Sequence, residues 1–304
     1  MILFSFPSHD YMAQGLLQLC ALERGECAVH RFPNQELYIT VKARVRGEHC
    51  VILGSITPPD EHVLSLLLLA HTLKKEGARR VTALLPYLAY SRHDKSKPGE
   101  SLAVAWAGSL FRASGIDGVI TADLHSQRDE HLLALPVTSL STATLFAEQI
   151  KLHGLTDATL VAPDNGAIRR CCEVRAAAGM SGEIFHFEKE RTLQGITHTG
   201  SKGDIRSTVV VVDDMLDTGG TLVSACEQLN EKGAREIYIM VTHGLFTGSQ
   251  WERLWELRVK KIFCTDTIAI PTEVRARPIA TLSVIPLLEP TLRQEVNDYA
   301  EQIR

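Results

Sequence analysis

The chain lacks the features that would place it in a membrane, outside the cell or on a nucleic acid. Its apolar runs, such as 66–70, are far too short to cross a bilayer, and no basic segment precedes the apolar residues at the N-terminus. A net charge of −4 provides no general attraction to nucleic acid or to an anionic membrane. We therefore expect a cytoplasmic protein that binds neither.

Cysteine usage indicates neither a disulfide framework nor a metal centre. The chain has 7 cysteines, an odd number, with no Cys-x-x-Cys pair and no spacing typical of metal ligands. We expect all of them to be reduced thiols, as in the cytosol. At 304 residues, with 45% hydrophobic and 22% charged residues, the chain has the composition of a soluble globular protein of about two domains.

A run of four valines, 209–212, predicts a strand buried on both faces, which is typical of a parallel sheet in an α/β domain. Asp213 and Asp214 follow at the expected carboxyl end of the strand, where open parallel sheets bind their ligands. The next residues predict a tight turn into a helix over about 222–232. The turn consists of Asp217, Thr218, Gly219, Gly220 and Thr221.

The chemistry of this turn suits a ribose phosphate. Its two glycines would let the backbone approach an anion closely, and the N–H groups of the turn and of the helix N-terminus favour negative charge. The two aspartates repel phosphate but suit sugar hydroxyls or a magnesium ion. An ordinary acidic turn after a buried strand is the alternative, but nine consecutive side chains agree with the motif in its expected context.

Strands and helices alternate along the rest of the chain, which predicts an α/β fold of mainly parallel, doubly wound sheets. Polar residues follow the predicted strands 118–122 and 158–162, at Asp123-Leu124-His125 and Pro163-Asp164. The polar stretch 188–203 contains Lys189, Arg191 and several glycines, and it predicts a loop that closes over phosphates. Without other support, Lys189 and Arg191 would be ordinary solvated charges.

An internal repeat indicates two similar domains. The segment 73–81 resembles 229–237, about half a chain later, and at this offset Asp213 aligns with Thr57. Only the second domain therefore keeps the acidic, glycine-rich turn. We expect domains at 1–142 and 143–304, with a final helix at 290–304 that can dock on either.

These stretches together resemble the ribose-phosphate pyrophosphokinases, the synthetases of phosphoribosyl pyrophosphate (PRPP), which have two tandem phosphoribosyltransferase-like domains. The resemblance extends over nearly the whole chain and is closer to the archaeal-type branch in the loop after Arg92. The segments that carry it, in chain order, are 31–36, 90–94, 123–125, 163–166, 189–191 and 213–221.

The resemblance implies transfer of pyrophosphate from ATP to the anomeric hydroxyl of ribose 5-phosphate, with AMP as the second product and Mg²⁺ as the cofactor. It implies catalytic roles for Lys189, Arg191 and His125, and metal contacts from His125 and Asp164. Ribose 5-phosphate would bind at Arg191, Asp213, Asp214 and the turn 217–221. The implied ATP-binding residues are Phe32, Asn34, Gln35, Glu36, Arg92 and His93.

Three departures from the family pattern fall in the nucleotide-binding segments. Asn34 replaces an aspartate, Gln35 a glycine and His93 a glutamine, so the nucleotide donor can differ from ATP. The loop 95–101 has two lysines, no arginine and an added carboxylate, Glu100. It therefore lacks the planar, two-pronged donors that bind phosphate best, and we expect weak feedback regulation.

Two other functions remain open on the sequence alone. One is a phosphoribosyltransferase that consumes PRPP, and the other is a non-catalytic, regulatory subunit associated with PRPP synthetases. The expected partners are ATP and ribose 5-phosphate. We also expect a homo-oligomer, a dimer or larger, because the family's counterpart of Phe32–Glu36 reaches the ATP site of a neighbouring subunit.

Overall fold

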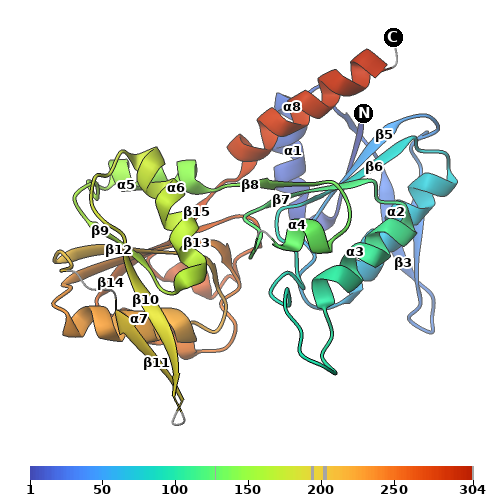
Figure 1. Ribbon diagram of the computed structural model, residues 1–304. Helices are drawn as coiled ribbons and strands as arrows, with labels where there is room; N and C mark the ends of the chain where they lie inside the picture. The colour runs from blue at the N-terminus through green and yellow to red at the C-terminus, as the bar shows by residue number, and fades with distance from the viewer. Residues whose placement is uncertain (127, 193–194, 201–203, 303–304) are drawn as a thin grey trace. The chain divides into compact units, whose positions relative to one another are not determined.

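The computed structural model describes residues 1–126, 128–192, 195–200 and 204–302, and it contains two compact units (Figure 1). Unit 1 comprises Met1–Leu140 and Val284–Arg304, and unit 2 comprises Ser141–Ser283. Each unit is a mainly parallel sheet flanked by helices, so the predicted α/β class is confirmed.

Unit 1 is built on six parallel strands in the order β2-β1-β5-β6-β7-β8. The strands are β1 (Ile2–Ser5), β2 (Glu23–Arg24), β5 (His49–Leu53), β6 (Arg80–Leu85), β7 (Gly118–Ala122) and β8 (Val137–Leu140). Its helices are η1 (Pro7–His9), α1 (Asp10–Leu19), α2 (Glu61–Lys75), α3 (Ala103–Ser114) and α4 (Arg128–Leu132). A separate antiparallel hairpin, β3 (Cys27–Arg31) and β4 (Leu37–Val41), packs against α2.

Helix α2 shows how the apolar pattern produces this fold. Leu66, Leu69 and Leu73 recur at helical spacing and are fully buried. The helix ends before Gly77, whose φ of 94° lies in the left-handed region that glycine adopts without strain. The N–H groups of Gly77 and Ala78 then cap the helix by donating to carbonyl oxygens of its last turn.

Unit 2 has seven strands in the order β11-β10-β9-β12-β13-β14-β15. They are β9 (Thr159–Ala162), β10 (Phe185–Thr192), β11 (Gly195–Gly200), β12 (Thr208–Leu216), β13 (Glu236–Gly244), β14 (Val259–Thr265) and β15 (Ile279–Leu282). All neighbours are parallel except β10 and β11. The helical segments are α5 (Ala143–Leu152), η2 (Asn165–Ala167), α6 (Ile168–Ala178), α7 (Gly220–Glu231), η3 (Gln250–Leu257) and η4 (Val274–Ala276).

The four valines of β12 are fully buried, as predicted, and they alternate between two hydrophobic cores. Val209 and Val211 belong to the core that includes residues of α7, whereas Val210 and Val212 belong to the core that includes residues of α5 and α6. The strand extends to Leu216, four residues beyond the valines, so Asp213 and Asp214 lie within it rather than after it.

The two units share one topology. In unit 1, β1 lies between β2 and β5, and β5 follows the β3–β4 hairpin in the sequence. In unit 2, β9 lies between β10 and β12, and β12 follows the β10–β11 hairpin. The remaining strands of each sheet continue outward in chain order. This correspondence confirms the two similar domains that the repeat predicted.

The prediction of a loop at 188–203 is wrong, because most of this stretch forms the β10–β11 hairpin (Figure 1). Lys189 pairs with His198 and Arg191 with Ile196. The polar composition of both strands concealed them, since the sequence lacks the apolar alternation of a half-buried strand. The side chains of Lys189 and Arg191 lie outside the described part of the structure.

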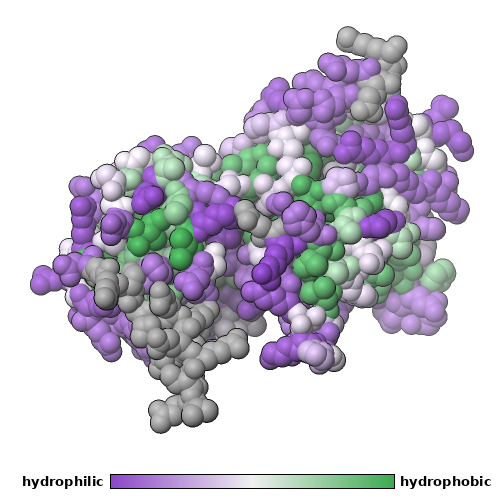
Figure 2. Space-filling view, in the orientation of Figure 1, coloured by the Kyte–Doolittle hydropathy of each residue, from purple (hydrophilic) through white to green (hydrophobic). Residues whose placement is uncertain are grey.

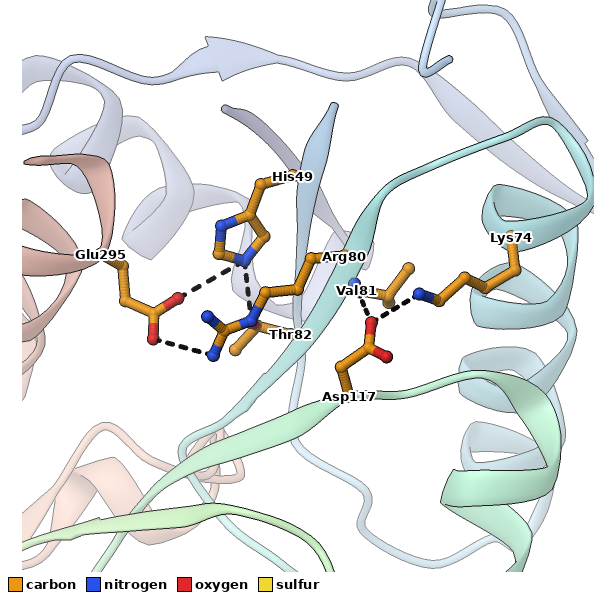
Figure 3. Close-up of polar contacts among 7 residues, drawn as sticks. All are labelled: His49, Lys74, Arg80, Val81, Thr82, Asp117 and Glu295. Atoms are coloured by element: carbon orange, nitrogen blue, oxygen red, sulfur yellow. Dashed lines mark hydrogen bonds and ion pairs between the residues drawn. The ribbon is translucent and has the colours of Figure 1, made fainter. Parts of the chain in front are cut away.

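The C-terminal helix α8 (Ile285–Gln302) belongs to unit 1, where it packs against α1. Unit 2 ends at Ser283, so the C-terminal helix lies with unit 1, one of the two docking places that the sequence left open. Leu288 and Leu292 of α8 are fully buried. Glu295 completes the attachment, because its two carboxylate oxygens lie 3.4 Å from His49 Nε2 and 3.4 Å from Arg80 Nη2 (Figure 3).

No helix in the described part of the chain is both long and apolar enough to span a bilayer. Figure 2 shows hydrophilic residues over much of the visible face. All seven cysteines are free thiols, as expected, and five of them are buried.

Candidate functional site

The acidic residues of unit 2 gather at the carboxyl edge of its sheet. Asp164 follows β9, and Asp213 and Asp214 lie near the end of β12, the parallel neighbour of β9. The chain leaves β9 toward β10 on one side and leaves β12 toward β13 on the other. This reversal of strand order is the place where doubly wound sheets bind their ligands.

Three carboxylates share this edge, and their effect is clearest on Asp213. Burial raises the pKa of Asp213 well above its usual value, and the neighbouring Asp214 and Asp164 raise it further, while Arg170 acts in the opposite direction. The Asp214 N–H donates to Asp213 Oδ1 at 2.9 Å, and the Gly166 N–H donates to Asp164 Oδ1 at 2.9 Å. The edge therefore concentrates negative charge that suits hydroxyl donors or a cation.

The glycine-rich turn connects β12 to α7. Gly219 has a φ of 87°, and its carbonyl oxygen accepts from the Val223 N–H at 2.8 Å, which is the first hydrogen bond of the helix. The Asp217 carbonyl oxygen accepts from the Thr247 N–H at 3.1 Å. Thr218 is exposed and Thr221 is half-buried in the first turn of α7. The turn thus presents hydroxyls beside the N-terminus of a helix, an arrangement that favours an anion.

Gly219 also has a packing role that the motif did not indicate. A Cβ at this position would lie 2.7 Å from Trp251 Cα and 2.8 Å from Trp251 Cβ. Both the close approach of Trp251 and the left-handed backbone require glycine here. A bulkier residue at 219 would therefore disturb the fold as well as ligand binding, so a substitution at Thr218 probes the turn more cleanly.

The residues at this edge fit an open magnesium site. In the described part of the chain no three histidine, cysteine, aspartate or glutamate side chains form a ready-made cluster for a metal ion. Mg²⁺ does not need one, since it is usually held by one or two carboxylates together with water and substrate phosphate oxygens. Asp164 and its acidic neighbours supply such carboxylates beside the glycine-rich turn.

In unit 1, four of the proposed nucleotide-binding residues lie in the tight turn of the β3–β4 hairpin. The Phe32 N–H donates to the Glu36 carbonyl oxygen at 2.9 Å, and the Glu36 N–H donates to Asn34 Oδ1 at 3.2 Å. Gln35, which replaces the family's glycine, has a left-handed φ of 72°. Phe32 is 49% exposed, with its ring centroid 4.5 Å from that of Tyr38. The turn thus presents an aromatic face to solvent.

Arg92 and His93 are exposed in the segment after β6. The preceding Tyr90 donates its hydroxyl hydrogen bond to Asp60, which raises the pKa of Tyr90 to about 12. His93 Nδ1 lies 3.2 Å from the Ser101 carbonyl oxygen. Glu100 forms an ion pair of 3.9 Å with Lys97, so the added carboxylate of this loop is partly neutralised.

His125 is exposed two residues after Asp123, which follows β7 with a φ of 38°. The Leu124 N–H donates to Ser139 Oγ at 3.2 Å and helps to hold this strand end. His125 therefore stands at the carboxyl edge of the unit 1 sheet, as predicted, whereas Asp164, Asp213 and Asp214 stand at that of unit 2.

Arg170 is the residue of this site that sequence reasoning missed. It is 4% exposed in α6 and lowers the pKa of Asp213, against the effect of the other carboxylates. The sequence carries no signal for it, because Arg169 beside it is equally basic and yet is exposed, pairing with Glu173 on the same helix.

Comparison with known proteins identifies relatives along nearly the whole chain. Residues 1–115 match the N-terminal domain of ribose phosphate pyrophosphokinase, and residues 194–301 match the phosphoribosyl synthetase-associated domain. The ribose-phosphate pyrophosphokinase of Bradyrhizobium diazoefficiens is 31% identical over 287 residues, which cover 90% of each chain. That of Bacillus caldolyticus is 29% identical over 290 residues, 94% of this chain and 91% of the relative.

A solved structure shows the same fold throughout. The crystal structure of phosphoribosylpyrophosphate synthetase from Mycobacterium smegmatis matches with a TM-score of 0.87 at 27% identity. The match covers 98% of this chain and 99% of that one, so both units and the C-terminal helix have counterparts in a single protein.

Proposed function

Because this chain belongs to the ribose-phosphate pyrophosphokinase family, we propose that it makes PRPP and AMP from ribose 5-phosphate and ATP. The observation that carries the proposal is the carboxyl edge of unit 2, where three carboxylates stand beside a turn suited to phosphate. Family membership favours synthesis of PRPP over its consumption by a phosphoribosyltransferase.

In the proposed reaction the anomeric hydroxyl oxygen of ribose 5-phosphate forms a bond to the β-phosphorus of ATP. The bond from that phosphorus to the oxygen bridging it to the α-phosphorus breaks, AMP leaves with the electron pair, and the hydroxyl proton is released. Such a transfer depends on positioning and charge neutralisation rather than on covalent catalysis.

Each part of unit 2 has a distinct task in this proposal. Asp213 and Asp214 accept hydrogen bonds from the ribose hydroxyls, and the turn 217–221 holds the 5-phosphate through N–H groups and hydroxyls. Lys189 and Arg191, on the β10–β11 hairpin, neutralise charge on the transferred group, and Arg191 also contacts ribose 5-phosphate.

Mg²⁺ is the proposed cofactor, and Asp164 and His125 are its proposed contacts. When bound, the ion would neutralise phosphate charge during the transfer. The test is the affinity of the protein for Mg²⁺ in the presence of ATP. We expect Asp164→Asn to weaken it, whereas Asp157→Asn, at an exposed aspartate outside the site, should leave it unchanged.

ATP is proposed to bind through the hairpin turn and the segment after β6. Phe32 offers an exposed ring on which adenine can stack, while Asn34, Gln35 and Glu36 surround it on the same turn. Arg92 and His93 would meet the phosphates. We propose that the protein works in the cytoplasm as a homo-oligomer, at least a dimer, in which this turn serves a neighbouring subunit.

One assay distinguishes synthesis from a purely regulatory role. The pure protein is incubated with ribose 5-phosphate, ATP and magnesium, and both AMP and PRPP are measured. Equal amounts of the two products are expected. ADP in place of AMP, or no product from a folded protein, would contradict the proposal. Light scattering at the assay concentration tests the assembly, and an active monomer would exclude the shared ATP site.

A further inference from the structure

Unit 1 contains a cavity of about 390 Å³ that the proposed reaction does not use. It lies beside the residues that follow β1, Phe6 to Ser8, and beside Ser55, which follows β5. These are adjacent parallel strands from which the chain departs in opposite directions, to β2 on one side and to β6 on the other. The cavity therefore occupies in unit 1 the same topological switch point that carries the carboxylates in unit 2.

The walls of the cavity combine an apolar surface with polar groups. Val29 and Leu37 contribute the apolar side from the β3–β4 hairpin, together with the ring of Phe6. Gly54 leaves space for that ring, because a Cβ at this position would lie 2.5 Å from Phe6 Cδ2. A volume of this size and a mixed lining are those of a small-molecule site.

Helix α2 provides the polar side through its first two turns. Ser65 lines the cavity and is only 8% exposed, and its side-chain hydroxyl has no hydrogen-bond partner among the described residues. His62 Nδ1 lies 2.8 Å from the Thr57 carbonyl oxygen, which can only accept, so Nδ1 carries the proton. In the neutral ring Nε2 is then an acceptor. The cavity thus offers both a hydroxyl and a ring nitrogen to a ligand.

The charges around the cavity balance. Arg31 of the hairpin forms an ion pair with Glu61 of α2, and both residues line the cavity. A phosphate would meet the Glu61 carboxylate without an unpaired cation to offset it, so a phosphorylated ligand is disfavoured. A free sugar is also a poor match, because its hydroxylated faces would contact the apolar wall.

We propose that this cavity binds an uncharged nucleoside. A nucleobase presents flat apolar faces to Phe6 and the hairpin, and its edge carries the donors and acceptors that complement His62 and Ser65. Arg31 also donates from Nη1 to the Gln35 carbonyl oxygen at 2.8 Å, which connects the cavity to the turn 32–36. A bound nucleoside would therefore change the Michaelis constant for ATP, an effect that rests on the proposed function.

The test is calorimetric titration of the full-length protein with adenosine, guanosine, cytidine and uridine. The titrations are repeated with the ATP site saturated by a non-hydrolysable ATP analogue. We expect at least one nucleoside to bind at micromolar to millimolar concentration under both conditions, and its 5′-monophosphate to bind at least tenfold more weakly once the analogue is present. Absence of binding by all four nucleosides would overturn the proposal.

Two variants locate the binding. Ser65→Leu fills the cavity and should abolish nucleoside binding, and Ser65→Ala, which removes only the hydroxyl, should weaken it roughly three- to tenfold. Ser109→Ala, at an exposed serine of α3, is the matched control and should change nothing. Binding that both Ser65 variants retain, or that the ATP analogue abolishes, would assign the nucleoside to the ATP site and overturn the proposal. These titrations measure binding alone, so their outcome is independent of whether the protein makes PRPP.

Discussion

Substituting Leu292 by alanine tests whether the C-terminal helix is part of the core of unit 1. Leu292 is fully buried, and α8 lies far from α1 and β5 in the sequence, so its contribution comes from tertiary packing. Truncating a buried leucine to alanine costs about 2–5 kcal/mol, the lost transfer free energy plus the cost of the cavity. We expect the upper part of that range if the neighbouring side chains cannot close the space.

The expected shift in melting temperature follows from the size of unit 1. For a domain of about 160 residues, 1 kcal/mol corresponds to roughly 2–4 °C, so a loss of about 3 kcal/mol lowers the transition by roughly 6–12 °C. The matched control is Leu152→Ala, the same change at a side chain that is 75% exposed. It should shift the transition by no more than a degree or two.

Hydrogen exchange shows which unit responds. Leu292→Ala should accelerate exchange in peptides from β1, α1 and β5 and leave those from β9 and β12 unchanged. Equal shifts for the two leucine variants would show that α8 is not part of the core of unit 1. Faster exchange confined to unit 2 would show that the helix stabilises unit 2 instead.

Three further predictions concern pH, turnover and substrate binding. Burial lowers the pKa of His49 in the folded protein to about 4, whereas its pKa in the unfolded chain is about 6.5. The contribution of neutral His49 to stability is therefore complete above pH 6.5 and is lost as the pH falls toward 4. His49→Gln should flatten this part of the stability profile, measured by denaturant unfolding. Lys189→Ala should lower kcat by about 10²–10³ with little change in either Michaelis constant, and near-normal turnover would make Lys189 an ordinary solvated charge. Thr218→Val should raise the Michaelis constant for ribose 5-phosphate about tenfold and leave that for ATP unchanged, whereas an equal rise in both would remove Thr218 from the phosphate site.

The sequence predicted the regular core of each unit because burial leaves a local pattern. The valines 209–212 have no polar face, and the apolar residues of α2 recur at helical spacing up to Gly77. Both patterns depend only on nearby residues. The carboxyl-edge position of Asp164 followed from the same reasoning, since parallel strands end at one edge of the sheet.

Features that depend on distant residues escaped prediction. The polar sequence of the β10–β11 hairpin has no alternation of apolar and polar residues to predict its strands, and the docking of α8 depends on partners such as His49, more than two hundred residues away. Arg170 and Arg169 are the same residue type and differ only in the face of α6 on which they lie, one buried and the other exposed. The packing of Trp251 on Gly219 likewise joins one residue that precedes α7 in the sequence with one that follows it, so a motif that indicates an anion site cannot reveal it.

The shared topology explains how one fold can serve two purposes in this chain. A switch point is formed by the order of the strands, and therefore persists in both units whatever residues occupy it. In unit 2 it carries Asp164, Asp213 and Asp214 beside a helix N-terminus, which suits hydroxyls, phosphate and a cation. In unit 1 the corresponding loop is Thr57-Pro58-Pro59-Asp60, and the space beside it has a mixed apolar and polar lining with balanced charge, so it favours a neutral ligand. The difference between the two sites therefore lies in the loops, hairpin and helix that surround each switch point, while the strand order of the sheets beneath them is alike.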